Sequence, residues 1–391
     1  MRATPDLRNA DTEDEAPLLA AIDRWCEREV KPIARDYDHA DRYPTETVEQ
    51  MKELGLFGAT IPLEYGGLGL AASTYAKIVM RISRDWMAIT GIFNSHLMLA
   101  LAIQKFGTQA QKEAWLPRFA SGEVRGGLAL TEPDAGTDLQ AIRTTALRQG
   151  NELVLNGQKT FITNGPYADT IVFICKLDEG NPPKERKVVS FVLDKGTPGL
   201  TQSKPLRKMG LHSSPTGELF VEDVRVGREH LLGETEHGPA RSGAKATFTQ
   251  ERTGVAAMAL GIVEQCRELS LEYARTRVQF GRPIGEFQLI QLKLAKMEVA
   301  RMNLQNLVFR QIEMAAEGHA MSLAEASACK LYAAQAAMDT ALEAVQLFGG
   351  NGYMAEYRVE QLARDAKVLQ IYAGTDEIQI SQIARSLLWD A

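Results

Sequence analysis

Apolar residues recur at helical spacing along the first third of the chain. One stripe consists of Leu18, Leu19, Ile22, Cys26 and Val30, and it ends at Pro32. A largely apolar stretch then covers residues 75–106. Both patterns predict helices.

The same spacing returns after about residue 233 in three long segments, over residues 246–276, 289–317 and 322–347. In the second segment five apolar residues share one face, namely Ile290, Leu294, Met297, Leu304 and Val308. Segments of this length and pattern are typical of helix bundles.

Between the two helical parts, short runs rich in β-branched and aromatic residues predict strands. Residues 170–175, 188–193 and 219–226 are such runs. Residues 153–162 read as two strands around a turn at Asn156 and Gly157. Strands at this close spacing, with no helices between them, indicate a small antiparallel barrel or sandwich.

Composition and charge exclude several classes of protein. The chain has 391 residues and a formal net charge of −6, without a basic tract, so nucleic acid is not an expected partner. No apolar run approaches the ~20 residues of a membrane-spanning helix, so we expect no membrane span. The N-terminal residues resemble neither a signal peptide nor a transit peptide, which favours a cytoplasmic, bacterial-type protein.

The cysteines and histidines show no ligand spacing. The four cysteines are scattered, and the six histidines form no cluster. We therefore interpret the cysteines as reduced core thiols and predict no metal site.

Five short motifs carry the candidate chemistry. Residues 130–138 read Leu-Thr-Glu-Pro-Asp-Ala-Gly-Thr-Asp, and residues 161–165 read Phe-Ile-Thr-Asn-Gly. Residues 277–288 begin Arg-Val-Gln-Phe-Gly and end Phe-Gln. Residues 346–353 read Gln-Leu-Phe-Gly-Gly-Asn-Gly-Tyr, and residues 372–379 read Tyr-Ala-Gly-Thr-Asp-Glu-Ile-Gln. In this order and spacing, the motifs resemble the signatures of acyl-CoA dehydrogenases.

The resemblance implies an α+β fold of three domains. These are an N-terminal α-helical domain (residues 1–124), a middle antiparallel β-barrel domain (residues 125–235) and a C-terminal four-helix bundle (residues 236–391). The resemblance also implies FAD as the cofactor, a homotetramer, and an electron-transfer flavoprotein as the electron acceptor. No Gly-X-Gly-X-X-Gly follows a strand, so a Rossmann-type site is not expected.

The motifs supply the residues that we expect around FAD. Glycine and short hydroxyl residues let the backbone approach a flat ligand, and an arginine at a helix end can pair with a pyrophosphate. The resemblance implies that Phe161 covers one flavin face and that Arg277 reaches FAD bound mainly by a neighbouring subunit. The expected cofactor residues are Leu128, Leu130, Thr131, Gly136, Thr137, Phe161, Thr163, Arg277, Gln279, Phe280, Gln288, Gln346, Gly349, Gly350, Thr375 and Glu377.

The implied reaction removes an α-proton and a β-hydride from an acyl-CoA thioester, as in β-oxidation or branched-chain acyl catabolism. In most of the family a glutamate, the base, follows the tyrosine of the last motif. Here that residue is Ala373, which can offer its backbone N–H to the thioester oxygen but cannot accept a proton.

A second position can supply the base. Isovaleryl-CoA and long-chain acyl-CoA dehydrogenases carry it in a Glu-Arg pair on the first bundle helix, and residues 249–252 here read Thr-Gln-Glu-Arg. This chain resembles that type, and Glu251 is the candidate base. A glutamate early in a helix is also favoured by the helix dipole alone, which is the structural alternative. The expected substrate contacts are Thr137, Arg252, Tyr372, Ala373 and Gly374.

Other functions and substrates stay open. An oxygen-using flavoenzyme of the nitroalkane-oxidase or N-hydroxylating type, or a catalytically silent flavin- or acyl-CoA-binding protein, is compatible with Ala373. Trp86 either shortens an acyl pocket or packs in the core, and we favour packing. Arg84 either meets a terminal carboxylate or is a solvated helix residue, and we favour the latter.

Overall fold

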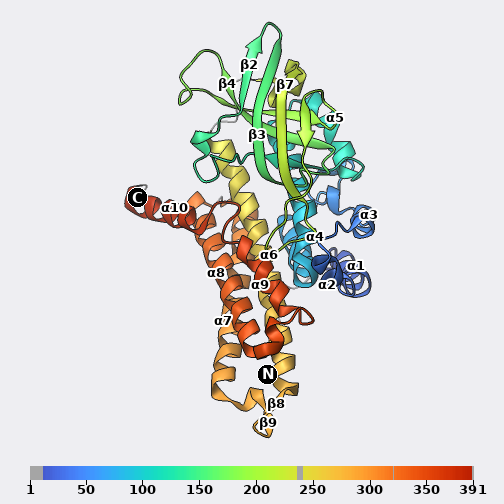
Figure 1. Cartoon of the computed structure of the whole chain (residues 1–391), viewed down its shortest axis with the longest axis vertical. Coiled ribbons are helices and arrows are strands. Elements are labelled where there is room, and N and C mark those ends of the chain that lie inside the picture. Colours follow the sequence, from blue (N-terminus) through green and yellow to red (C-terminus); the bar gives the residue numbers. More distant parts are fainter. Residues whose placement is uncertain (1–11, 236–240, 320, 390–391) are drawn as a thin grey trace.

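Helices, strands and helices succeed one another along the chain (Figure 1). The computed structural model describes residues 12–235, 241–319 and 321–389, without the side chains of residues 241–251 and 253. The first part contains α1 (Ala16–Trp25), α2 (Ala34–His39), α3 (Thr45–Glu53), α4 (Ala72–Phe106) and α5 (Gln109–Ala120). Its order of elements agrees with the helical N-terminal part expected from the apolar spacing.

Helix α4 folds back on itself at Trp86, which has a non-helical φ of −161° and ψ of 90°. The Tyr75 hydroxyl donates to the Asn94 side-chain oxygen at 2.7 Å, although a straight helix would separate these residues by about 28 Å. The Trp86 ring is 1% exposed and lies 5.8 Å from the ring of Tyr37, so it is a packing residue, as we interpreted it. Helix α4 is long and apolar enough to cross a membrane, but 78% of its apolar window is buried inside the protein.

The middle part is a seven-stranded sheet with the order β1-β4-β2-β3-β7-β6, and β5 pairs with β4. The strands are β1 (Gly126–Ala129), β2 (Thr145–Gln149), β3 (Glu152–Thr163), β4 (Thr170–Asp178), β5 (Val188–Asp194), β6 (Leu200–Gln202) and β7 (Thr216–Val226). The prediction of a purely antiparallel domain is wrong in one respect, because β1 and β2 both pair with β4 in parallel. Parallel neighbours need long connections, and strand spacing in a sequence does not reveal which strands they join.

The predicted turn at Asn156 and Gly157 is also wrong. Residues 152–163 form one strand, and the register against β7 shifts between Leu155 and Gly157, which marks a β-bulge. The turn between β2 and β3 lies instead at Gly150, whose φ is +63°.

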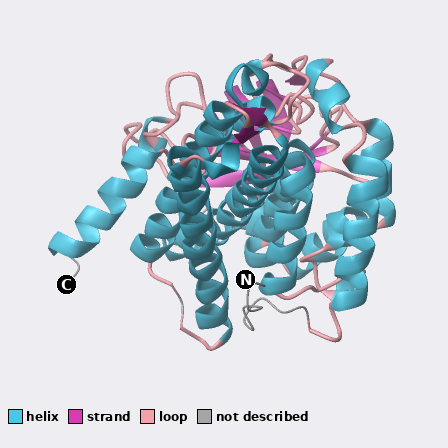
Figure 2. Ribbon diagram, turned by 90° about the horizontal axis from the view of Figure 1, so that it is seen from below, coloured by secondary structure: helices cyan, strands magenta, loops and turns pink. Residues whose placement is uncertain are grey.

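The third part returns to helices and confirms the bundle pattern. It contains α6 (Arg241–Thr276), the short strands β8 (Val278–Gln279) and β9 (Arg282–Pro283), α7 (Gln288–Ala316), α8 (Leu323–Phe348), α9 (Val359–Val368) and α10 (Asp376–Trp389). On α7, Met297, Leu304 and Val308 of the predicted stripe are buried. Helix α6 packs against α4, α7 and α8, whereas α10 projects from the body of the molecule (Figures 1 and 2).

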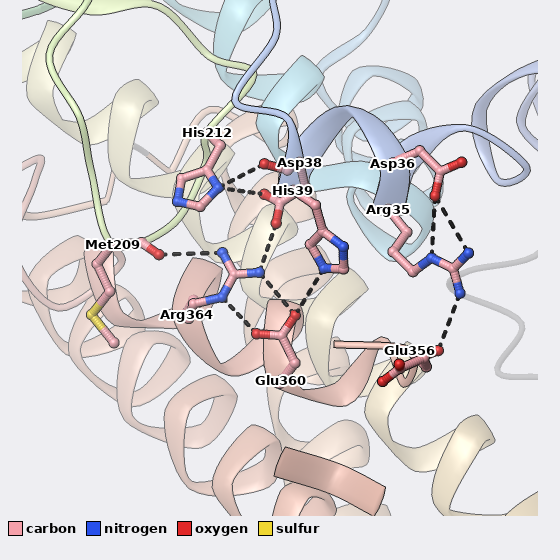
Figure 3. A network of polar contacts seen from close by, with 9 residues as sticks. All are labelled: Arg35, Asp36, Asp38, His39, Met209, His212, Glu356, Glu360 and Arg364. Carbon is pink, nitrogen blue, oxygen red and sulfur yellow. Dashed lines mark hydrogen bonds and ion pairs between the residues drawn. The ribbon is translucent and has the colours of Figure 1, made fainter. Parts of the chain in front are cut away.

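The three parts meet at a polar junction (Figure 3). Arg364 on α9 binds a carboxylate oxygen of Asp38 on α2 at 2.6 Å, and it also pairs with Glu360 on α9. His212, in the connection between β6 and β7, lies 2.8 Å from the Asp38 carbonyl oxygen. The junction therefore fixes α9, which leads into the last motif, against the two other parts.

Candidate active site

The first motif forms the loop between β1 and β2, and a buried ion pair holds it. The Lys159 ammonium on β3 donates to the Glu132 carboxylate at 2.7 Å and to the Leu130 carbonyl at 2.9 Å. Burial lowers the pKa of Lys159, and the bond to Glu132 counteracts part of that shift. Burial also acts to raise the pKa of Glu132, but its hydrogen bonds outweigh burial and the net pKa is lowered. Each group of the pair thus stabilises the charge of the other.

The structure brings the first two motifs together. The Thr160 N–H donates to the Thr131 carbonyl at 2.9 Å, so Thr131 lies beside β3. A side chain on Gly127 would lie 2.5 Å from the Thr163 carbonyl oxygen, so the end of β3 also lies against β1. In this region Leu128, Leu130, Thr131 and Thr163 are half-buried, and Gly136 and Thr137 are exposed.

Phe161 has the exposure and the backbone strain of a ligand-covering residue. Its side chain is 67% exposed, and its φ is +58°, in the left-handed region that costs a non-glycine residue about 1–2 kcal/mol. An exposed aromatic ring held in a strained conformation beside short hydroxyl residues fits a flat aromatic group such as a flavin.

The third and fourth motifs meet at the far end of the bundle. The Arg277 N–H donates to the Tyr273 carbonyl at 2.8 Å, and the Asn351 amide donates to the Tyr273 hydroxyl at 2.9 Å. The Tyr273 ring also stacks on Phe348 at a centroid distance of 4.0 Å. The remaining expected cofactor residues of these motifs are all exposed at this end, namely Gln279, Phe280, Gln288, Gln346, Gly349 and Gly350.

A single chain does not bring the two groups of expected FAD residues together. The first group lies on the sheet, whereas Arg277 and its neighbours lie beside β8 and β9 at the opposite end of the molecule (Figure 1). Helix α6, with 36 residues, spans about 54 Å between these ends. FAD is far shorter than this helix, so no one molecule of it can reach both groups within one chain.

The last motif forms the C-terminal loop (residues 369–375) between α9 and α10. Ala373 and Gly374 both have left-handed backbone angles, with φ of +52° and +88°. The Gln379 side-chain amide donates to the Ala373 carbonyl at 3.1 Å and to the Gly374 carbonyl at 2.8 Å. Within the described chain, the Ala373 N–H has no hydrogen-bond acceptor. This donor is available to a ligand oxygen.

Two buried cations lie behind the C-terminal loop. The Lys330 ammonium on α8 is fully buried, donates to the Gly374 carbonyl at 2.8 Å and lies 3.6 Å from the Asp376 carboxylate. Arg252 on α6 is buried and donates to the Ser327 hydroxyl at 3.0 Å. Its guanidinium lies 3.8 Å from the position that a Cβ on Gly374 would occupy. The structure thus places Arg252 beside the C-terminal loop.

The other expected residues of this region are placed as follows. The Tyr372 hydroxyl contacts the Met258 sulfur on α6 at 3.3 Å. Thr375 is half-buried, and Glu377 is exposed in the first turn of α10. Glu251 belongs to α6 and precedes Arg252, but its side chain lies outside the described residues.

Arg84 is bound by α6 and is not free for a ligand carboxylate. Its guanidinium donates to the Gln265 side chain at 3.1 Å and forms an ion pair with Glu268. The Arg84 side chain is still 38% exposed, which agrees with the interpretation as a solvated helix residue, and it also links α4 to α6.

Sequence reasoning missed the residues that support the loops. Lys159, Lys330 and Gln379 make the hydrogen bonds described above, but none was singled out. A lysine flanked by apolar residues inside a predicted bundle helix, as at Lys330, was the available signal, because lysines are rarely fully buried without a partner.

Comparison with known proteins agrees with this architecture. The chain matches three families: the acyl-CoA dehydrogenase N-terminal domain over residues 12–123, the middle domain over 127–224 and the C-terminal domain over 242–388. It is 38% identical to an acyl-CoA dehydrogenase of Bacillus subtilis, over 96% of this chain and 98% of that protein. It is 34% identical to the mitochondrial isovaleryl-CoA dehydrogenase of Pongo abelii, over 97% of this chain and 90% of that protein.

A solved structure shows the same fold. Butyryl-CoA dehydrogenase from Megasphaera elsdenii superimposes with a TM-score of 0.90 at 36% identity, covering 96% of this chain and 98% of that one. The motifs, the order of the domains and these comparisons lead to one conclusion: the chain belongs to the acyl-CoA dehydrogenase family of flavin-dependent oxidoreductases.

Proposed function

We propose that this enzyme oxidises an acyl-CoA thioester to the 2-enoyl-CoA and that Glu251 takes the α-proton. The observation that supports this proposal is the contact between α6 and the C-terminal loop. Arg252, the residue after Glu251, lies beside Gly374, so the backbone at residue 251 comes close to the loop that carries Ala373. A base from this position replaces the carboxylate that Ala373 cannot supply.

The Ala373 N–H is suited to the carbonyl oxygen of the thioester. Loss of the α-proton places negative charge on that oxygen, and a fixed N–H donor stabilises the charge as it develops. The left-handed loop and its bonds to Gln379 hold the donor in place before the reaction, so the protein need not reorganise during it.

The residues on the sheet and at the end of the bundle fit FAD. Thr131, Phe161 and Thr163 would surround the flavin, and Arg277 would pair with the pyrophosphate of FAD held by a second copy of the chain. Bound FAD supplies the acceptor for the β-hydride, and an electron-transfer flavoprotein then takes the electrons. Because the two groups lie at opposite ends of one chain, we propose an oligomer, a homotetramer by resemblance.

Glu251→Gln tests the base. We expect the variant to retain FAD and to bind acyl-CoA, but to lose anaerobic bleaching of the flavin by substrate by at least ~10²-fold, since general-base catalysis contributes about that much. A matched control is Glu272→Gln, an exposed position on the same helix about 30 Å further along. If Glu251→Gln bleaches as fast as wild type, the assignment fails.

The acyl group is defined by the same assay. A panel of straight, branched, aryl and dicarboxylyl CoA thioesters is mixed with the enzyme without oxygen, and the rate of bleaching is compared. Arg84 is engaged by Gln265 and Glu268, so we expect a terminal carboxylate to bring no advantage through this residue.

An oxygen-using flavoenzyme is the second candidate, and the small side chain of Ala373 is compatible with it. Reoxidation of the reduced enzyme distinguishes the two functions. Slow reoxidation by oxygen and fast reoxidation by electron-transfer flavoprotein support the dehydrogenase, whereas the opposite order supports the oxygen-using enzyme.

A further inference from the structure

Lys330 is buried where a cation is costly. Its side chain has no exposed surface, and burial lowers the pKa of its ammonium group, with Asp376 acting in the opposite direction. Replacing a buried ion pair with apolar residues is often neutral or stabilising in proteins, so stability alone does not explain a lysine here. The buried position of Lys330 therefore needs an explanation other than stability.

The hydrogen bond of Lys330 reaches the peptide group between Gly374 and Thr375, the second peptide group after the one that carries the Ala373 N–H. Its ammonium donates to the Gly374 carbonyl at 2.8 Å, and the same oxygen accepts from Gln379 at 2.8 Å. A hydrogen bond from a charged donor is stronger than one between neutral groups. Lys330 therefore fixes a loop whose residues Ala373 and Gly374 are both in the left-handed region.

Helix α8 links this contact to the other side of the loop. Ser327 lies one turn before Lys330, and its hydroxyl accepts from Arg252, whose guanidinium lies against Gly374. One helix thus contacts both supports of the loop. A shift of α8 would move both of them together.

We propose that Lys330 is a positioning residue that holds the Ala373 N–H in place for the thioester oxygen. This inference rests on the proposed function. Lys330 does not reach the substrate itself, and it acts by keeping the Gly374 carbonyl, and with it the left-handed loop, in one orientation. Without it, the donor is less well fixed and the enolate-like oxygen is less stabilised.

The test uses a substrate analogue that can lose its α-proton but not its β-hydride. A 3-thiaacyl-CoA has sulfur in place of the β-carbon, so its bound, deprotonated form stacks on oxidised flavin and gives a long-wavelength charge-transfer band. Titration of this band with pH gives the apparent pKa of the α-proton in the complex. This readout reports stabilisation of the anion and does not depend on turnover.

Lys330→Met is compared with Lys77→Met. Lys77 on α4 is also buried and pairs with Glu15, the residue before α1, so its replacement removes a similar ion pair. For Lys330→Met we expect full FAD content and an apparent pKa of the α-proton raised by about one unit, which corresponds to a roughly tenfold loss of anion stabilisation. This loss is smaller than the effect of removing a donor that contacts the oxyanion directly. For Lys77→Met we expect a lower melting temperature and no shift of the band.

If both variants titrate as wild type does, the inference is wrong. Should Lys330→Met fail to fold, Gln379→Leu removes the other donor to the Gly374 carbonyl, and it should shift the apparent pKa in the same direction. An unshifted band in Gln379→Leu overturns the inference as well. Failure of the proposed function has a different result, because wild type would then show no bleaching with any acyl-CoA.

Discussion

Asp365 on α9 shows how one buried carboxyl can control the junction between the three parts of the chain. Its carboxylate accepts the Leu211 N–H at 2.6 Å and lies fully buried near the carboxylate of Asp38. Burial, together with the charge of Asp38, raises the pKa of Asp365 to about 7. The cationic side chains of Lys208, Arg358 and Arg364 lie near this pair of carboxyls, and the His212 imidazole also faces it.

The raised pKa predicts a pH-dependent stability. The unfolded chain releases this proton near pH ~4, whereas the folded chain keeps it up to about pH 7, so stability falls as the pH rises between these values. Asp365→Asn stays neutral and keeps an acceptor for the Leu211 N–H. We expect it to be more stable than wild type at pH 8 by roughly 2–4 kcal/mol, and similar at pH 4.

Melting temperatures measured from pH 4 to pH 8 check this expectation. Asp36→Asn, which changes an exposed carboxylate of α2 that pairs with Arg35, is the control and should follow wild type (Figure 3). Equal pH slopes for Asp365→Asn and wild type would contradict the assigned protonation.

At the level of residues, the sequence motifs indicated the candidate ligand-contacting residues better than the residues that hold the loops in place. The motifs indicated Thr131, Phe161 and Ala373 because glycines, hydroxyl residues and an exposed aromatic have recognisable spacing. Gln379 ends the last motif, but the motif does not reveal that its side chain binds the Ala373 and Gly374 carbonyls. No motif includes Lys330, because a contact between α8 and a loop 44 residues later in the sequence places its side chain.

Among the elements, Gly157 illustrates how local reading of a strand fails. An Asn-Gly pair favours a hairpin turn, but here tertiary pairing with β7 carries the strand through and leaves a bulge. The glycine is needed because a Cβ there would lie 2.5 Å from the Thr144 hydroxyl oxygen and 2.8 Å from the Thr144 Cα.

Gly157→Ala should therefore destabilise the fold more than Gly150→Ala, which changes the turn between β2 and β3. Gly150 also has a positive φ, but a Cβ there would meet no atom within 4 Å, so Gly150→Ala introduces backbone strain without a clash. We expect about 1 kcal/mol of destabilisation at Gly150 and roughly 2–4 kcal/mol at Gly157. Denaturant unfolding of the two variants measures the difference, and equal costs would argue against a close approach of β3 to Thr144.

The long helices were predictable because apolar spacing over 25 or more residues leaves no alternative period. The kink of α4 was not predictable from the sequence. Trp86 leaves the helical region without a proline or glycine at its position. Hydrogen bonds from Tyr75 to Asn94 and from Ser83 to Thr90 join the two halves of the helix. The parallel pairing of β4 with β1 and β2 was also not predictable from the sequence, since the whole sheet determines which strands pair.

For the whole molecule, the separation of the expected FAD residues is the property with most consequences. Sequence motifs indicate which residues contact a cofactor but not whether one chain can assemble them. Here the sheet and the β8–β9 end lie at opposite ends of the molecule, which supports our proposal that a second copy supplies Arg277 (Figure 1). Exposed apolar residues on α7 and α10, such as Leu289, Val299 and Leu387, offer surface for such an assembly.

Arg277→Gln tests this arrangement, because Arg277 is exposed in the single chain and its loss should leave the fold intact. We expect a melting temperature of the FAD-free protein like that of wild type, but an FAD affinity at least ~10-fold lower, as for loss of a charge-assisted contact to phosphate. The control is Arg275→Gln, another exposed arginine two residues away.

Fluorescence titration with FAD gives the affinities, and sedimentation at the same concentrations gives the oligomeric state. If wild type releases FAD on dilution only where the oligomer dissociates, the site is shared between copies. If a dissociated chain holds FAD as tightly as the oligomer, Arg277 acts elsewhere.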